Sequence, residues 1–296
     1  MAKTPAVIKN ISELRRRFYK SVKHKESLLA LIAEAEVAEQ VYNSNAIENS
    51  TLTFEETDKI LLEVDPGRYI SIQEHFEAVN LAEVIRYINE NAKKEELTPE
   101  IILKLHEMLL SDIRDNIKGR FRKTGEWVRV GGHIGLDPDQ IMAAIEEMFA
   151  HYYATSEENI IRRIAKLHLT FEYIHPFIDG NGRIGRVIIN YLLIREGYVP
   201  ITITFTDRSL YYDAFEEFES SGKTSLMEAI IGKALTNSYH KRLAYLEGME
   251  IVNLREYSRR FNISHSNLIN KAHRQTIPAF LEKGKWKIGI PAEKQK

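Results

Sequence analysis

The chain has 296 residues, of which 28% are charged and 44% hydrophobic, and its formal net charge is −1. This composition is that of an ordinary soluble globular protein, and the length predicts roughly two domains. The chain has no cysteine, which excludes disulfides, thiolate catalysis and zinc sites with cysteine ligands. The first residues lack the apolar core of a signal peptide and no apolar run approaches a membrane span, so we expect a cytoplasmic protein without membrane contact.

Most of the chain is predicted to be helical, because apolar residues recur at helical spacing and polar capping residues or prolines stand before them. The predicted helices span residues 26–45 and 162–174, and others begin near Ser71, Thr98, Asp137 and Arg183. One segment differs. From Glu126 to Gly132 the residues alternate and end in a Gly-Gly pair, which predicts a short β-hairpin within residues 124–134. The fold class is therefore predicted to be mainly α with one small hairpin.

Residues 175–186 read His-Pro-Phe-Ile-Asp-Gly-Asn-Gly-Arg-Ile-Gly-Arg and lie between two predicted helices. The glycine-rich turn can form a nest of backbone N–H groups at the N-terminus of the second helix, which favours anions. Asp179 offers a hard oxygen ligand for Mg²⁺, and Arg183 and Arg186 can hold phosphate oxygens. His175 is the strongest general-base candidate at this loop.

Each of these features is more often structural when it occurs alone. A Gly-Asn-Gly turn is usually a plain turn, a histidine at a helix end is usually a cap, and two arginines three residues apart usually form a solvated face. Their joint occurrence in this order favours a functional site. His168 differs, because it shares a helix face with Ile164 and Phe171, and we interpret it as a packed core histidine.

The segment resembles the signature of Fic-family proteins, His-x-Phe-x-[Asp/Glu]-Gly-Asn-Gly-Arg-x-x-Arg, and matches all eight fixed positions. The resemblance implies a helical Fic core that transfers AMP from ATP, with release of pyrophosphate. In that core, His175 would activate a Ser, Thr or Tyr hydroxyl of a target protein or of the chain itself. Asp179 would bind Mg²⁺, and Phe177 would anchor the loop in the core. The implied phosphate-binding residues are Gly180, Asn181, Gly182, Arg183 and Arg186.

The signature recognises phosphates and not the base, so transfer of UMP, phosphocholine or a phosphoryl group is an alternative. The predicted hairpin also lies where Fic proteins carry a flap that docks the target chain by strand addition. The implied docking residues are Val128, Arg129, Val130 and Gly131.

Residues 44–49, Ser-Asn-Ala-Ile-Glu-Asn, resemble the inhibitory motif of regulated Fic proteins, [Ser/Thr]-x-x-x-Glu-[Gly/Asn], in the version that precedes the catalytic core. The resemblance implies that Glu48 pairs with Arg186, the guanidinium that the γ-phosphate needs, so that ATP binds with its α-phosphate wrongly aimed. Ser44 and Asn49 would hold the helix end in place. In some relatives the same glutamate supports removal of AMP, so a de-AMPylase is a second alternative.

The end of the chain is basic, since residues 249–296 hold ten Lys and Arg against four Asp and Glu. The resulting net charge of +6 leaves −7 for residues 1–248. Within residues 253–290 a helix, a turn, a second helix and a small wing are predicted, which resembles winged helix-turn-helix modules of the excisionase and MerR type. The expected partner is DNA, with a protein as the alternative. The predicted DNA contacts are Ser266, Asn267, Asn270, Lys271, Arg274, Lys283, Lys285 and Lys287.

Three parts are therefore predicted: an N-terminal helical region with the inhibitory motif (1–95), a Fic catalytic core (96–248) and a winged helix-turn-helix-like domain (249–296). The main functional expectation is an autoinhibited adenylyltransferase that uses ATP and Mg²⁺. A hypothesis of a different class is a DNA-binding regulator whose Fic core senses nucleotide. The resemblance also implies a homo-oligomer.

Overall fold

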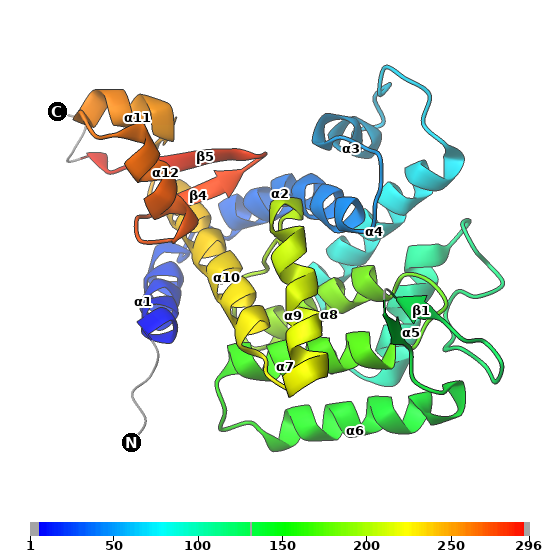
Figure 1. Ribbon diagram of the computed structural model, residues 1–296. Helices are drawn as coiled ribbons and strands as arrows, with labels where there is room; N and C mark the ends of the chain where they lie inside the picture. The colour runs from blue at the N-terminus through cyan, green and yellow to red at the C-terminus, as the bar shows by residue number, and fades with distance from the viewer. Residues whose placement is uncertain (1–5, 131, 293–296) are drawn as a thin grey trace. The chain divides into compact units, whose positions relative to one another are not determined.

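The computed structural model describes residues 6–130 and 132–292 and is mainly helical (Figure 1). The helices are α1 (Ala6–Ser21), α2 (Glu26–Ile47), α3 (Phe54–Leu61), α4 (Ile72–Asn91), α5 (Pro99–Leu110), η1 (Pro138–Gln140), α6 (Ile141–Ala154), α7 (Ile160–Ile174), α8 (Asn181–Arg195), η2 (Phe205–Asp207), α9 (Arg208–Ser221), α10 (Ser225–Leu246), α11 (Leu254–Phe261) and α12 (His265–His273). The strands are β1 (Arg129–Val130), β2 (His133–Ile134), β3 (Glu250–Asn253), β4 (Ala279–Glu282) and β5 (Lys285–Ile290). In this described part, no helix combines the length and the apolar character that a membrane span requires.

The chain divides into two compact units. One unit comprises residues 1–39 and 232–296, and the other comprises residues 40–231. α2 and α10 each contribute to both units, because α2 includes the boundary after Glu39 and α10 the boundary before Gly232. The three-part organisation expected from the sequence stays a prediction.

α8 is the central helix of the unit formed by residues 40–231. From Asn181 to Ile194 all of its residues except Gly182 are buried. A helix that is buried on all sides has to be covered by its neighbours, and α8 packs against α4, α5 and α7. α8 begins with the last two residues of the Gly-Asn-Gly turn. Its packing therefore buries the end of the 175–186 segment, including Arg183 and Arg186.

The helices expected on either side of the signature are present. α7 starts after Asn159, whose side chain accepts a hydrogen bond from the Ile161 N–H at 2.8 Å. α8 starts at Asn181, two residues before the expected position, because Gly180 takes the N-cap with a left-handed φ of 80°. Glycine adopts this conformation without the strain that a side chain would cause.

The other predicted helix starts are confirmed with one difference. Ser71 caps α4 by accepting from the Glu74 N–H, and Thr98 caps α5, whose first residue is a proline. Asp137 also caps a helical turn, but that turn is the 3₁₀ helix η1, and α6 follows it directly at Ile141.

The predicted hairpin is present and shorter than expected. β1 pairs antiparallel with β2, and Val130 lies opposite His133. The expected extended segment from Glu126 does not join the ladder. Instead, the Glu126 carboxylate accepts hydrogen bonds from the Lys123 N–H at 2.7 Å and from the Arg120 guanidinium at 2.7 and 2.8 Å. The side chain thus closes a loop where the alternating pattern predicts a strand.

The last forty residues or so of the described chain form a three-stranded antiparallel sheet in the order β3-β5-β4, with α11 and α12 beside it. The predicted helix, turn, second helix and hairpin are all present, and β3 is an additional strand. Seven buried residues form a common apolar core in this region: Val252, Leu254, Leu268, Ala272, Ala279, Ile288 and Ile290. This shared core holds the two helices and the sheet of the segment together.

A buried ionic network lies within the unit formed by residues 1–39 and 232–296. The Lys241 ammonium is 3.0 Å from Glu39 and 3.4 Å from both Glu36 and Glu282. The neighbouring Arg242 is 2% exposed and forms an ion pair with Glu36. Burial alone would lower the pKa of Lys241, but the three carboxylates raise it above its ordinary value. Lys241 therefore stays charged and joins the first part of α2 to α10 and β4.

Replacement of Lys241 by methionine is expected to destabilise the protein by about 3–5 kcal/mol, because it leaves buried carboxylates without their counter-charge. Urea denaturation followed by circular dichroism would measure the loss. Lys93→Met is the matched control, because Lys93 is an exposed lysine outside this network. Equal denaturation midpoints for the two variants would contradict a stabilising role of the network.

Candidate active site

His175 ends α7 in a left-handed conformation, with φ of 50°. Its backbone carbonyl accepts a hydrogen bond from Arg122 Nε at 2.9 Å, which helps to hold this uncommon geometry. Its Nδ1 lies 3.3 Å from the backbone carbonyl oxygen of Glu172. A carbonyl only accepts hydrogen bonds, so Nδ1 carries the proton and Nε2 keeps a free lone pair.

The imidazole of His175 lines a cavity of about 240 Å³ together with Glu48, Glu172, Tyr211 and the hairpin residue Val130. Burial lowers the pKa of His175 to about 4. The ring is therefore neutral at pH 7, which is the form that a general base requires.

The Gly-Asn-Gly turn is fixed from the inside by the Asn181 side chain. Its Oδ1 accepts from the Phe177 N–H and its Nδ2 donates to the Phe177 carbonyl, both at 2.8 Å. The Asn181 side chain therefore does not cap the backbone N–H groups at the start of α8. These groups are the donors that a helix N-terminus normally leaves without an intrahelical partner. The turn is thus held in one shape, with N–H groups that could bind an anion, although the Gly180 N–H donates to Asp179 Oδ1 at 2.7 Å.

His106 supports this loop from α5 and was not expected from the sequence. Its ring stacks on Phe177, with the ring centroids 3.7 Å apart. The Gly119 N–H donates to His106 Nδ1, so the proton is on Nε2, which donates to the Asp179 carbonyl at 3.1 Å. Burial lowers the pKa of His106 to about 4, so the ring supports the loop in its neutral form.

A polar cavity of about 230 Å³ lies on the outer side of the turn. Asp179 and Arg183 line it, with their side chains 3.3 Å apart, and Arg183 also lies 3.6 Å from Glu77. Among the described residues, Arg183 Nε and Asn45 Oδ1 are buried polar atoms without a hydrogen-bond partner. The Arg183 guanidinium can donate to a phosphate oxygen here, whereas the Asp179 carboxylate repels phosphate unless a cation lies between them.

The donors of this cavity also fit Mg²⁺ bound to a polyphosphate. Mg²⁺ is commonly held by one or two carboxylates together with substrate phosphates. Asp179 supplies such a carboxylate, and its side chain is 30% exposed at the cavity wall. Within residues 6–130 and 132–292 no three His, Asp or Glu side chains gather to hold a metal alone, so Asp179 would depend on the phosphates for the remaining ligands.

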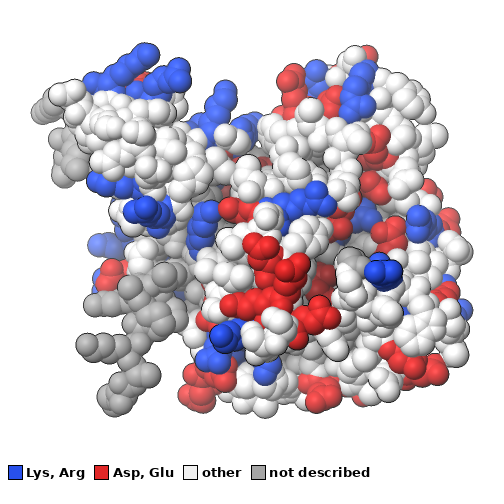
Figure 2. Space-filling view, in the orientation of Figure 1, with Lys and Arg blue, Asp and Glu red and all other residues white. Residues whose placement is uncertain are grey.

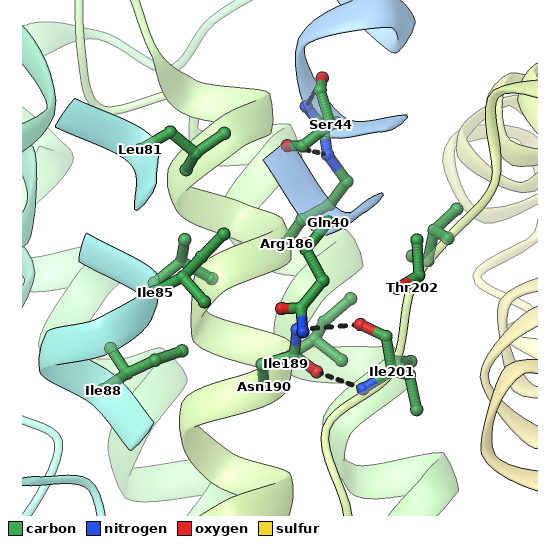
Figure 3. A pocket seen from close by; sticks show the side chains of 12 residues that line it. Gln40, Ser44, Leu81, Ile85, Ile88, Arg186, Ile189, Asn190, Ile201 and Thr202 are labelled. Carbon is green, nitrogen blue, oxygen red and sulfur yellow. Dashed lines mark hydrogen bonds between the residues drawn. The ribbon is translucent and has the colours of Figure 1, made fainter. Parts of the chain in front are cut away.

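Arg186 is 7% exposed and makes four polar contacts. Its Nε donates to Ser44 Oγ at 2.9 Å and its Nη2 donates to the Ser44 carbonyl at 2.8 Å and to Glu48 Oε1 at 2.9 Å. Nη1 lies 3.4 Å from Tyr211 Oη. Figure 3 shows the guanidinium reaching up to Ser44 at the side of α8. Arg186 is therefore occupied on three sides by α2 and α9.

Glu48 follows the last residue of α2, at the edge of both cavities. Asn49 has a left-handed φ of 69°, and its side chain accepts from Arg208 at 2.7 Å. Gly182 leaves room for the pair, since a Cβ there would collide with Glu48 and come within 3.1 Å of Arg186 Nη1. The end of α2 is thus held with its carboxylate against the turn.

The structure brings the candidate residues of the two sequence motifs together around one loop. Of the hairpin residues, Val130 reaches the cavity wall, and the Val128 carbonyl accepts from the Gly135 N–H. Arg129 pairs with Ile134 in the ladder. Gly131 lies outside the described residues.

Four residues at the site were missed by the sequence reasoning: His106, Arg122, Glu172 and Tyr211. His168, expected in the core, is fully buried, and its Nε2 lies 2.8 Å from Tyr211 Oη. A signal existed for His106, because it is a polar residue on the apolar face of the helix after Thr98. Tyr211 lies in a helix that the apolar pattern did not predict.

Replacement of Gly185 by alanine is expected to destabilise the protein. A Cβ at Gly185 would collide with Glu172 and come within 2.9 Å of the buried His168 ring. Overpacking of this kind costs about 1–3 kcal/mol, which exceeds the gain of about 1 kcal/mol in helix propensity. A lower thermal midpoint is the expected readout. The matched control is Gly132→Ala, whose Cβ would meet nothing within 4 Å, and a raised midpoint for Gly185→Ala would contradict the packing argument.

Comparison with known proteins identifies the core of this site. Residues 96–193, which include the loop and most of α8, match the Fic/DOC family. This segment is similar to Fic/DOC family domains.

The chain is also similar to named proteins in animals. The chain is 34% identical over 227 residues to the protein adenylyltransferase Fic of Drosophila grimshawi. The aligned region covers 71% of this chain and 45% of that protein. It is also 34% identical over 183 residues to the protein adenylyltransferase Fic of Nematostella vectensis, covering 59% of this chain and 42% of that protein. The chain thus spans less than half the length of these relatives.

Solved structures share the fold. A Fic domain containing signaling protein from Bacteroides thetaiotaomicron superposes with a TM-score of 0.73 at 22% identity and covers 81% of this chain and 97% of that chain. A Fic family protein from Desulfovibrio desulfuricans has a TM-score of 0.66 at 18% identity and covers 98% of this chain and 97% of that chain. The predicted Fic-like helical fold is therefore confirmed.

Proposed function

We propose that the chain is an autoinhibited protein adenylyltransferase, which transfers AMP from ATP to a Ser, Thr or Tyr hydroxyl of a target protein or of itself. The observation that carries the proposal is the Glu48–Arg186 pair, 2.9 Å long, at the mouth of an anion-binding loop that also presents His175. The names of the animal relatives support the same activity.

In the proposed reaction, His175 Nε2 takes the proton from the incoming hydroxyl. The hydroxyl oxygen attacks the α-phosphorus of ATP, and the bond from that phosphorus to the bridging oxygen of the β-phosphate breaks. Pyrophosphate leaves, and AMP stays on the target. The ring becomes an imidazolium, with its Nδ1–H still donating to the Glu172 carbonyl.

The residues of the loop hold the phosphates during this step. N–H groups at the start of α8 bind the α-phosphate, and Arg183 and Arg186 bind the β- and γ-phosphates. Mg²⁺ bound at Asp179 would neutralise the charge of the phosphates. The hairpin β1–β2 offers the target an exposed strand edge, with Val130 next to the cavity.

In the proposed autoinhibition, Glu48 acts by occupying the guanidinium of Arg186. Arg186 Nε and Nη2 already donate to Ser44 and Glu48, so these two nitrogens cannot bind a γ-phosphate as a pair. The Glu48 carboxylate also adds negative charge where the γ-phosphate would lie. ATP then binds with its α-phosphate out of line for the attacking hydroxyl, and transfer is slow.

The proposal is tested by intact-mass spectrometry after incubation of the Glu48→Gly variant with ATP and Mg²⁺. Addition of an adenylyl group to the chain, or to a target protein supplied with it, is the expected result. Unmodified protein together with intact ATP binding would reject adenylyl transfer. Loss of a preformed adenylyl group from a labelled target would favour the de-AMPylase.

A second proposed property is DNA binding by the C-terminal segment. The predicted contact residues on α12 are all exposed: Ser266, Asn267, Asn270, Lys271 and Arg274. The wing residues Lys283 and Lys285 are exposed too, whereas Lys287 is half-buried and pairs with Glu282 at 2.5 Å. Figure 2 shows further basic side chains over α11.

Fluorescence anisotropy with a mixed-sequence DNA duplex tests this property. The full-length chain is expected to bind more weakly as salt increases, and Lys271→Glu with Arg274→Glu is expected to abolish binding. Lys93→Glu, an exposed charge change outside this segment, is the control. Absence of binding by the wild type at low salt would reject DNA as the partner and leave a protein contact.

A further inference from the structure

Glu172 is a buried carboxyl group for which the steps described so far have no use. It lies on the same face of α7 as His168 and His175, at spacings of four and three residues. Its side chain is only 10% exposed, and it lines the same cavity as His175 and Glu48. Among the described residues, Glu172 Oε1 is a buried oxygen without a hydrogen-bond partner. Such a group is costly, so its position calls for an explanation.

The geometry relates Glu172 to the imidazole of His175. Oε2 of Glu172 lies 3.9 Å from His175 Nδ1, and the Glu172 carbonyl oxygen lies 3.3 Å from the same atom. Both the backbone and the side chain of Glu172 therefore face Nδ1. Nε2, on the opposite side of the ring, is left for the reacting hydroxyl.

We propose that Glu172 is a positioning residue whose ionised carboxylate stabilises the imidazolium of His175 during transfer. The inference rests on the proposed function. When Nε2 takes the hydroxyl proton, Nδ1 keeps its own proton and the ring gains one positive charge. The carboxylate near Nδ1 offsets that charge without accepting a proton, and the proton on Nε2 later leaves to solvent or to pyrophosphate.

An offset is needed because the site disfavours a charged ring. Burial is the main reason that His175 has a low pKa, and Arg122 and His133 lower it further. The site therefore resists the imidazolium that transfer must form. A carboxylate 3.9 Å from the ring is a favourable charge in a buried environment, where Coulomb interactions are strong.

The charged groups around Glu172 connect its proposed effect on His175 with the proposed inhibition by Glu48. It faces Glu48 after α2, Arg186 on α8 and Tyr211 on α9, besides the two histidines of its own helix. Burial, followed by the Glu48 charge, raises the pKa of Glu172 to about 8 against the opposing effect of Arg186. Removal of Glu48 therefore favours the ionised form of Glu172. Glu48 would then restrain the enzyme twice, at Arg186 and through the charge of Glu172.

The test uses the Glu48→Gly variant as the parent protein and compares it with the Glu48→Gly, Glu172→Gln double variant. The amide keeps the size of the side chain and removes its charge. Above the pKa of Glu172, where the carboxylate is ionised, we expect kcat for AMP transfer to fall about ten- to hundredfold in Glu172→Gln, as for loss of part of an acid–base device, while KM for ATP changes less than about twofold. In the parent, kcat should rise with pH as Glu172 ionises, and this rise should be absent in Glu172→Gln. Glu146→Gln on α6, an exposed glutamate, is the control.

A second readout does not depend on catalysis. The imidazole resonances of His175, assigned by their loss in His175→Ala, are followed by NMR as the pH is raised. Ionisation of a carboxyl 3.9 Å away should produce an inflection on the alkaline side of neutrality in the protein with Glu172. Glu172→Gln should lack it.

The possible results separate the two proposals. No AMP transfer by the Glu48→Gly parent would reject the proposed function, and the NMR inflection would still decide whether Glu172 acts on His175. Transfer by the parent with unchanged kcat in Glu172→Gln would reject only the role of Glu172. An equal loss of ATP affinity and thermal stability in Glu172→Gln would show a purely structural role and overturn the inference.

Discussion

Alanine in place of His175 is expected to lower AMP transfer by the Glu48→Gly variant about 10²–10⁴-fold, the usual contribution of general acid–base catalysis. The imidazole is the group at the loop whose Nε2 is free to take a proton, because Nδ1 is held by the Glu172 carbonyl. ATP binding should persist, since we propose that α8 and its arginines, and not His175, hold the phosphates. The result is thus a fall in kcat with little change in KM for ATP.

Initial rates of AMP incorporation at several ATP concentrations measure this effect. His151→Ala is the matched control, because His151 is an exposed histidine in the last turn of α6. An unchanged kcat in the His175→Ala variant would remove His175 as the base. A large rise in KM with unchanged kcat would instead give the ring a role in ATP binding.

Glycine in place of Glu48 is expected to raise AMP transfer about ten- to hundredfold over the wild type. The substitution frees Arg186 Nη2 from a charged hydrogen bond of 2.9 Å. Hydrogen bonds to charged groups contribute about 1.5–3 kcal/mol, and about 1.4 kcal/mol corresponds to a factor of ten. A γ-phosphate can then take the place of the carboxylate on the guanidinium.

The control for this substitution is Glu63→Gly, which removes one charge two residues beyond the end of another helix, α3. Glu63 is exposed and has a left-handed φ of 57°, so glycine fits there without strain. Transfer by Glu63→Gly should equal that of the wild type. Equal rates for the wild type and Glu48→Gly, with ATP bound by both, would contradict autoinhibition through Arg186.

Much of the fold could be predicted because its signals are local. Capping residues such as Ser71 and Thr98 act within one turn, and they mark the true starts of α4 and α5. The loop at residues 175–186 has its chemistry in consecutive positions, so its residues meet whatever the rest of the chain does. For the same reason the Gly-Gly pair predicted the presence of the hairpin. It did not predict how short the strands are.

The remaining parts of the site depend on contacts between distant segments. Tyr211 reaches Arg186 from α9, and Arg122 reaches the His175 carbonyl from a loop. Neither residue stands in a pattern that marks it. The unpaired carboxyl of Glu172 was equally hidden, since its position on α7 has meaning only once the burial of that face is known. Such residues are selected by tertiary packing, which one-dimensional periodicity does not contain.

The central claim is that the α-phosphorus of ATP is the reacting centre and that Glu48 keeps it from reacting. The most direct test supplies the Glu48→Gly variant and Mg²⁺ with ATP labelled at either the α- or the γ-phosphate, and follows label on protein. Label from the α-position alone, lost in the Glu48→Gly, His175→Ala double variant and weak in the wild type, is the predicted result. Label from the γ-position, or no label while ATP remains bound, would contradict the account.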